Sequence, residues 1–435
     1  MPANDMRRAS RPARILAVVI TFAASAAAPA ARADAIADWN LIASNTINTT
    51  AAYPKVTAQE LRPVVQVDLA TVHVAIYDAV NAIVGGYRPF AVSPSSPTAG
   101  ASPESAAGAA ACAVLYGLFP NRAPVYSNAC LPYQAGSPGT AAHVKGVAVG
   151  IEVALGILAL RANDGRSTVV TYVPSGEPGN FSPSPATPTP VNIFVPFIRP
   201  FTMKSASQFR ADGPPALGSA RYAEDLNEVK AYGGAVSTLR TDEQSEIARF
   251  HTEPPPAFWT RNLRQFSSND HSLAENARLM AMMWVTHADL TIACFESKYH
   301  YTFWRPRAAI PAAATDGNDA TAADAGWLPF VPTPNHPEYP AAHACTAGGT
   351  AEVLKAFYGS KKLSFDFTST VTGLSHHFDS TDDMVKELQV ARIYGGMHFR
   401  TSAAHGRVLG MKVGKWVTKN YFRPVKEWPV VSGID

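Results

Sequence analysis

The sequence predicts an all-α protein whose helical bundles pack around one oxyanion-binding site. Three observations support this prediction. Apolar residues recur at three- and four-residue steps along several segments, as they do on one face of an α-helix. Capping residues and glycines mark where these segments begin and end. Cationic and imidazole side chains gather in the stretch from Lys298 to Ser402, which indicates a site for a small anion.

The composition is that of an ordinary globular protein. The chain has 435 residues, a length that allows two to three domains or one large one. With 47% hydrophobic and 16% charged residues it is neither disordered nor fibrous. A formal net charge of +3 is too small to indicate a nucleic-acid partner.

Residues 1–33 have the pattern of a secretory signal peptide. A run of arginines comes first, then an apolar stretch from Ile15 to Ala30, then Ala31-Arg32-Ala33 as a cleavage site. The pair Arg7-Arg8 also leaves a twin-arginine signal open. Beyond residue 33 no uninterrupted apolar run reaches about 18 residues. We therefore expect an exported protein, periplasmic or secreted, without an integral membrane anchor.

The first predicted domain covers residues 34–200 and is helical. Amphipathic or alanine-rich segments at 61–83, 102–119 and 141–162 predict three helices, the second opened by Ser102-Pro103-Glu104. From about residue 165 to 215 the chain is rich in Pro, Ser and Gly. A connection of that length is either a functional lid or an inter-domain wrap, and we place the domain boundary there.

The second predicted domain, residues 201–435, is helical as well. Apolar periodicity and capping signals predict helices at about 217–231, 241–250, 272–301, 344–358, 380–394 and 402–421. Lys298 falls in the last turns of one of these helices, and Pro306 is expected to end that segment just after Arg305. Gly395-Gly396 breaks another helix and turns His398 away from the face that carries Arg392.

The four cysteines suggest oxidised pairs in an exported chain. Cys112 and Cys130 enclose a short Pro- and Tyr-containing connection and are the better candidates for a disulfide. Cys294 and Cys345 both fall near the expected anion site. They either pair with each other or remain as small buried hydrophobes.

The anion site is expected to draw on three short segments. On a helix, Lys298 and Arg305 would point to one face, roughly 10 Å apart along the axis. His343 stands at the start of a helix, whose N-terminal N–H groups favour an anion. Arg392 adds a third cation, and His398 a second imidazole. Guanidinium groups suit the anion's oxygens, one histidine suits its central atom, and another suits proton transfer.

In these segments the chain resembles the vanadium-dependent haloperoxidases and the related type 2 phosphatidic acid phosphatases and bacterial acid phosphatases. That family's signature is Lys-x6-Arg-Pro, then Pro-Ser-Gly-His, then Ser-Arg-x5-His-x3-Asp. Here the first part is Lys298-x6-Arg305-Pro306, the second is Pro340-Ala341-Ala342-His343, and the third is Ala391-Arg392-x5-His398-x3-Ser402. The resemblance extends over roughly residues 270 to 420.

Two departures from the signature lead to expectations of their own. Ala341 replaces a serine, so it offers no hydroxyl to the oxyanion, although the N–H of Ala342 can still donate. Ser402 replaces a carboxylate, so we expect His398 to have only a neutral partner. Ser402 is also expected to cap the last helix.

The resemblance implies an exported vanadium-dependent haloperoxidase. It implies that vanadate is bound through His398, the metal ligand, and held by Lys298, Arg305, Arg392 and the Ala342 N–H, with Ser402 beside the histidine. His343 would be the acid–base group, and His336 and Trp304 would face halide or substrate. The substrates would be hydrogen peroxide, a halide and a small organic acceptor. A histidine at position 336 is typical of the family's bromoperoxidases, which favours bromide.

Two other functions remain open on the sequence alone. The first is an acid phosphatase in which His398 attacks phosphorus and His343 protonates the leaving group. The second is an exported oxyanion-binding protein without turnover, which the replacements at Ala341 and Ser402 suggest.

Overall fold

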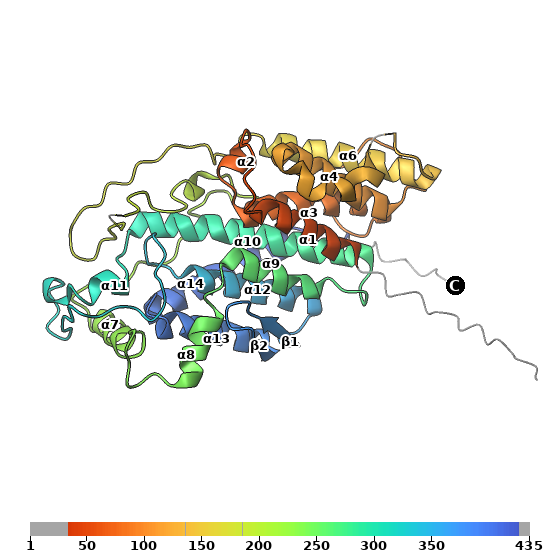
Figure 1. Cartoon of the computed structure of the whole chain (residues 1–435). Helices are drawn as coiled ribbons and strands as arrows, with labels where there is room; N and C mark the ends of the chain where they lie inside the picture. Colours follow the sequence, from red (N-terminus) through yellow and green to blue (C-terminus); the bar gives the residue numbers. More distant parts are fainter. Residues whose placement is uncertain (1–33, 135, 185, 426–435) are drawn as a thin grey trace, which may run out of the picture. The chain divides into compact units, whose positions relative to one another are not determined.

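The structure, a computed structural model, describes residues 34–134, 136–184 and 186–425. The predicted signal peptide therefore lies outside the described residues. Within them the chain is helical, with one small two-stranded sheet, and the predicted fold class is confirmed (Figure 1).

The N-terminal half places one long helix, α3, in the interior. Its 20 residues are mostly buried and contact α4, α6 and the later helix α10. Gly85 ends it with a φ of 77°, a backbone conformation that favours glycine. The helices of this half are α1 (Ala35–Asn48), α2 (Ala58–Leu61), α3 (Val65–Val84), α4 (Pro103–Leu118), α5 (Ala123–Cys130) and α6 (Ala141–Arg161).

The C-terminal half is organised by α10, a 29-residue helix. Ser272 and Glu275 form a capping box at its start, which fixes where the helix begins. Figure 1 shows α10 running between the N-terminal helices and α12. The helices of this half are α7 (Ala220–Tyr232), α8 (Asp242–Phe250), α9 (Pro255–Leu263), α10 (Leu273–Tyr301), α11 (Pro306–Ala309), α12 (Ala342–Tyr358), α13 (Thr381–Tyr394) and α14 (Arg400–Asn420).

The backbones of α12 and α14 approach so closely at Gly348 and Gly410 that a side chain at either position would clash. A Cβ added at Gly410 would lie 1.9 Å from the carbonyl oxygen of Cys345, and one at Gly348 would lie 2.4 Å from that of Arg407. Glycine at these positions is therefore required by the contact between the two backbones. The contact sets where the first turn of α12 lies relative to α14.

The sequence did not predict the hairpin of β1 (Lys362–Thr368) and β2 (Ser375–Ser380). The strands pair antiparallel, with Phe365 opposite Phe378. Phe365, Phe367 and Phe378 are buried, whereas most of the intervening side chains are exposed, which is the alternation of a strand with one buried face. Helices α1, α2, α5, α9 and α11 were also not predicted.

One hydrophobic core runs through the described residues from Ile36 to Phe422. The predicted domain boundary near residue 200 stays a prediction, because side chains from both sides of it share this core. The Cys112–Cys130 disulfide is present, and its prediction is confirmed. Cys294 and Cys345 are buried free thiols with their sulfurs 3.1 Å apart.

Two helices, α3 and α6, are long and apolar enough to cross a membrane by length and composition alone. For α3, 83% of the apolar window is buried inside the protein, as in the core helix of a globular domain. For α6 the buried share is 39%.

Candidate oxyanion site

Lys298 and Arg305 reach the site from different backbone elements. Lys298 is fully buried in the last turn of α10. The prediction that both cations share one helix is wrong, because α10 ends at Tyr301 and Thr302 takes a left-handed conformation, with φ 47°. Arg305 instead precedes α11, and Pro306 begins that short helix rather than ending α10.

The Lys298 ammonium group is committed to backbone carbonyls. Its Nζ donates to the carbonyl oxygens of Pro337 at 3.0 Å and Glu338 at 2.8 Å. This cation therefore fixes the extended segment before α12 as well as adding positive charge to the site.

Arg305 holds two histidines of the site together. Its Nη1 donates to Nε2 of His398 at 3.1 Å and to the carbonyl oxygen of Met397 at 3.1 Å. Its Nη2 lies 3.0 Å from Nδ1 of His336, and its Nε donates to the His336 carbonyl oxygen at 2.9 Å. Because guanidinium groups only donate, both imidazole nitrogens facing Arg305 must accept.

His398 has a charged partner that sequence reasoning missed. Its Nδ1 lies 2.8 Å from Oε1 of Glu338, which is fully buried and also accepts from the Phe399 N–H at 3.0 Å. Since Nε2 accepts from Arg305, Nδ1 must carry the proton and donate to Glu338. His398 therefore presents the Nε2 lone pair toward the cations. A lone acid between Pro337 and Pro340, in the segment that carries His336 and His343, was the available signal.

Ser402 does not have the role expected of it. The last helix begins at Arg400 with Phe399 as its N-cap, so Ser402 lies within the first turn and caps nothing. Its hydroxyl is buried and makes no hydrogen bond of ordinary geometry in the described part of the chain. It approaches the Glu338 carboxylate closely enough to help lower the pKa of that acid. The prediction that His398 has only a neutral partner is wrong.

Arg392 lines the cavity from the last turn of α13. Its Nη1 donates to the carbonyl oxygen of His251 at 3.1 Å, and its Nη2 contacts the Met397 sulfur at 2.8 Å. Its Nε is buried and has no partner among the described residues. An unpaired donor on a buried cation is costly, and an anion in the cavity would satisfy it.

His343 and Ala342 lie at the N-terminal end of α12. The helix begins at Ala342, and Ala341 provides no side-chain cap, so the first N–H groups are free to donate. The His343 ring has no hydrogen-bond partner in the described residues and faces the cavity. Burial, together with Arg392, holds the pKa of His343 well below its usual value, so the imidazole is neutral and able to accept a proton.

The charges of the site do not balance. Lys298, Arg305 and Arg392 are buried and face one buried carboxylate, Glu338, among the described side chains around them. Burial lowers the pKa of Lys298 to about 8, of Arg305 to about 10 and of Arg392 to about 9. Burial raises the pKa of Glu338 to about 7, because its effect exceeds that of Lys298 and Arg305, which lower the pKa. A bound anion would offset this excess of positive charge.

A cavity of about 560 Å³ opens onto the site. His336, Ala342, His343, Arg392 and His398 line it, so the structure brings these predicted residues together. Lys298 and Arg305 lie behind the histidines. The remaining wall includes residues of α3 and its approach, of the Pro-rich connection and of α10, namely Val65, Gln66, Val191, Asn192, Leu290 and Phe295.

Trp304 is not brought to this cavity. Its side chain is 4% exposed and lies beside the hydroxyl of Tyr222, and the cavity lining does not include it. The predicted substrate contact of Trp304 is therefore not supported by its position.

Known proteins resemble both the sequence and the fold. Residues 278–427 match the family described as the VCPO second helical-bundle domain. Over 288 residues the chain is 24% identical to the vanadium chloroperoxidase of Curvularia inaequalis, an alignment that covers 49% of this chain and 46% of that protein. The chain thus spans about half the length of this curated relative.

Two solved structures share the fold over most of their length. The crystal structure of the first bacterial vanadium-dependent iodoperoxidase has a TM-score of 0.70 at 22% identity, covering 90% of this chain and 96% of that one. A holo bacterial vanadium-dependent chloroperoxidase has a TM-score of 0.67 at 16% identity, covering 87% and 95%.

The described chain combines a helical fold with a cavity whose imidazole and guanidinium groups suit a small oxyanion. Residues 278–427 are thus similar to a domain of the vanadium chloroperoxidases, and the described chain has the fold of solved vanadium-dependent haloperoxidases.

Proposed function

We propose that this chain is an exported vanadate-dependent haloperoxidase that oxidises halide with hydrogen peroxide. The observation that carries the proposal is the state of His398. Glu338 holds the proton on Nδ1, so the Nε2 lone pair faces a group of buried cations. A lone pair for the central atom and cations for its oxygens are what a vanadate site requires.

The residues present fit vanadate. His398 Nε2 would bind the metal, while Lys298, Arg305 and Arg392 would neutralise its oxygens. The Ala342 N–H and the unpaired Nε of Arg392 would donate to it. Vanadate bound there would supply the activation of peroxide toward attack by halide.

His343 is the proposed proton acceptor for peroxide. It lines the same cavity as His398, and its lowered pKa keeps the ring unprotonated at neutral pH. A neutral imidazole without a competing partner can take a proton from an entering peroxide and return it to a leaving group.

The halide is proposed to approach beside His336, and bromide is favoured. The His336 ring is held between Arg305 and Phe295, whose ring centroid lies 5.2 Å away, at the wall of the cavity. The cavity volume is in the range of small-molecule sites, which leaves room for an organic acceptor. The relatives are an iodoperoxidase and chloroperoxidases by name, so the test must compare halides.

The decisive experiment separates peroxidase from phosphatase. Purified protein is reconstituted with orthovanadate and supplied with peroxide, a dimedone-type reporter and chloride, bromide or iodide in turn. We expect halogenation with bromide and iodide, dependent on vanadate and lost in His398→Ala. A matched control, Ser402→Ala, should retain it, because the Ser402 hydroxyl makes no hydrogen bond of ordinary geometry to the described residues and Glu338 still holds His398.

Other outcomes would favour the competing functions. Fast hydrolysis of an aryl phosphate without halogenation would make the protein a phosphatase. Vanadate binding without either activity would make it an oxyanion-binding protein.

Export is part of the proposal and has its own test. Residues 1–33 carry the signal pattern, and a protein recovered from the periplasm or medium should begin at about residue 34. Recovery of the uncleaved chain from the cytoplasm alone would contradict export.

A further inference from the structure

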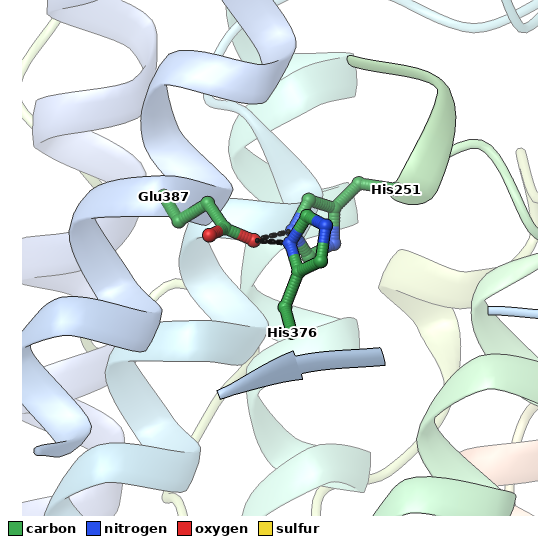
Figure 2. Close-up of side chains that lie close together, drawn as sticks. All are labelled: His251, His376 and Glu387. Carbon is green, nitrogen blue, oxygen red and sulfur yellow. Dashed lines mark hydrogen bonds and ion pairs between the residues drawn. The ribbon is translucent and has the colours of Figure 1, made fainter. Parts of the chain in front are cut away.

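A second polar cluster lies next to the oxyanion site and takes no part in the proposed reaction. It consists of His251, which follows α8, His376 on β2, and Glu387 on α13. Figure 2 shows both imidazoles directed at one carboxylate oxygen. Oε1 of Glu387 lies 2.8 Å from Nε2 of His251 and 2.7 Å from Nδ1 of His376. The end of α8 thus meets the consecutive elements β2 and α13 at one point.

The ring of His376 is held from two further sides. Its Nε2 lies 2.7 Å from Oε2 of Glu246, a residue of α8. Phe250 stacks on the ring, with centroids 3.7 Å apart and planes 11° apart. A histidine that points one nitrogen at a centre and donates from the other to a carboxylate is the usual arrangement around a metal ion.

We propose that His251, His376 and Glu387 bind a divalent transition-metal ion, with Zn²⁺ the best fit. The three ligand atoms lie within 4.8 Å of one another. Two imidazole nitrogens, one carboxylate oxygen and a water would give Zn²⁺ its preferred four-coordinate shell. Zinc–ligand bonds of about 2.0–2.1 Å place ligand atoms roughly 3.3 Å apart, so each contact to Glu387 needs to open by only about 0.5 Å.

The metal would have a structural role. The carbonyl oxygen of His251 accepts from Nη1 of Arg392 at 3.1 Å. A metal ion that holds His251 in place would therefore also help to position Arg392. The ion would join the hairpin to α13 and to the end of α8, and it would support one wall of the cavity. This proposal does not depend on the protein being a haloperoxidase.

The test measures metal binding directly. Tag-free protein is dialysed against a chelator and titrated calorimetrically with Zn²⁺, and Co²⁺ is added separately as a visible probe. We expect one equivalent of Zn²⁺ per chain, a rise in melting temperature of several degrees, and the visible d–d absorption of four-coordinate Co²⁺. His376→Ala and Glu387→Gln should each weaken Zn²⁺ binding by about tenfold or more.

His377→Ala is the matched control. His377 is the next residue on the same strand, but its ring is exposed and pairs with Asp366 at 2.7 Å. This variant should bind Zn²⁺ as the wild type does.

A loss of binding must be distinguished from misfolding. Glu387→Gln keeps an oxygen acceptor for both histidines, so the metal-free variant should melt near the temperature of the metal-free wild type if its fold is intact. If the wild type takes up no stoichiometric Zn²⁺, or if His376→Ala and Glu387→Gln bind it equally well, the three residues form only a hydrogen-bonded cluster and the proposal is wrong.

Discussion

The Glu338 carboxylate and Nδ1 of His398 lie 2.8 Å apart, although the two residues are 60 positions apart in the chain. The carboxylate that the family signature places four residues after the histidine is supplied here by the segment before α12. The serine at position 402 therefore does not leave His398 without a charged partner, because Glu338 makes the contact expected of the signature acid.

Glu338→Gln should weaken vanadate binding by about tenfold to a hundredfold, because a neutral amide orients His398 and raises its basicity less than a carboxylate does. The vanadate-induced shift in melting temperature measures the loss. Ser402→Ala should leave that shift unchanged. The reverse pattern would show that Ser402, and not Glu338, orients the histidine.

Ser402→Asp should weaken vanadate binding. The signature alone would suggest the opposite, because the substitution restores the family's acid. The new carboxylate would be buried close to Glu338, and two neighbouring carboxylates disfavour each other's ionised form. Calorimetric titration with vanadate tests this. Tighter binding in Ser402→Asp would mean that Glu338 is a poor substitute for the signature acid.

Vanadate binding should decline as the pH rises through about 8, the value to which burial lowers the pKa of Lys298. Below this pH the ammonium group is charged and attracts the anion, and above it the charge is lost. Because vanadate itself changes charge with pH, Lys298→Met is the reference. The wild type should bind more tightly than Lys298→Met at pH 7, and the difference should shrink by pH 9. A constant difference would show that Lys298 stays protonated.

Gly410→Ala should destabilise the protein by about 1–3 kcal/mol, because the added methyl group would meet the Cys345 carbonyl oxygen and force α12 away from α14. The start of α12 would shift with it, so vanadate binding should weaken too. Gly218→Ala is the control, since a Cβ there meets nothing within 4 Å. Chemical denaturation of both variants decides the matter, and equal stability would contradict the close contact.

Loss of the Cys112–Cys130 disulfide should cost about 3 kcal/mol, the stabilisation usual for a loop of this size, which spans 18 positions. The double variant Cys112→Ser/Cys130→Ser should therefore melt at a lower temperature. A reducing agent should lower the melting temperature of the wild type and leave that of the double variant unchanged. No response of the wild type would indicate that the bond does not form.

Local sequence signals predicted most helices because their causes are local. The predicted ranges 272–301 and 61–83 lie close to α10 and α3, where Ser272 with Glu275 starts one helix and Gly85 ends the other. The end of α10 at Tyr301 agrees with the predicted range, but the turn after it, which separates Arg305 from the helix of Lys298, was not predicted, since a left-handed Thr302 has no signature in sequence. Glu338 was missed because its partner is distant in the chain, and only the fold brings an extended Pro-rich segment against the turn that carries His398.

The connection from about residue 165 to 215 has a consequence beyond its length. Asn180 pairs with Phe303, and the Val191 N–H donates to the Asn335 carbonyl oxygen, so the connection lies against the segments that carry Arg305 and His336. It adds Val191 and Asn192 to the cavity wall, and α3 adds others, all outside the family-matched residues 278–427. Part of the cavity wall therefore comes from residues outside the stretch that carries the cations and histidines of the site. Exchanging this connection is therefore expected to change which molecules enter the cavity while leaving Arg392, His343 and His398 in place.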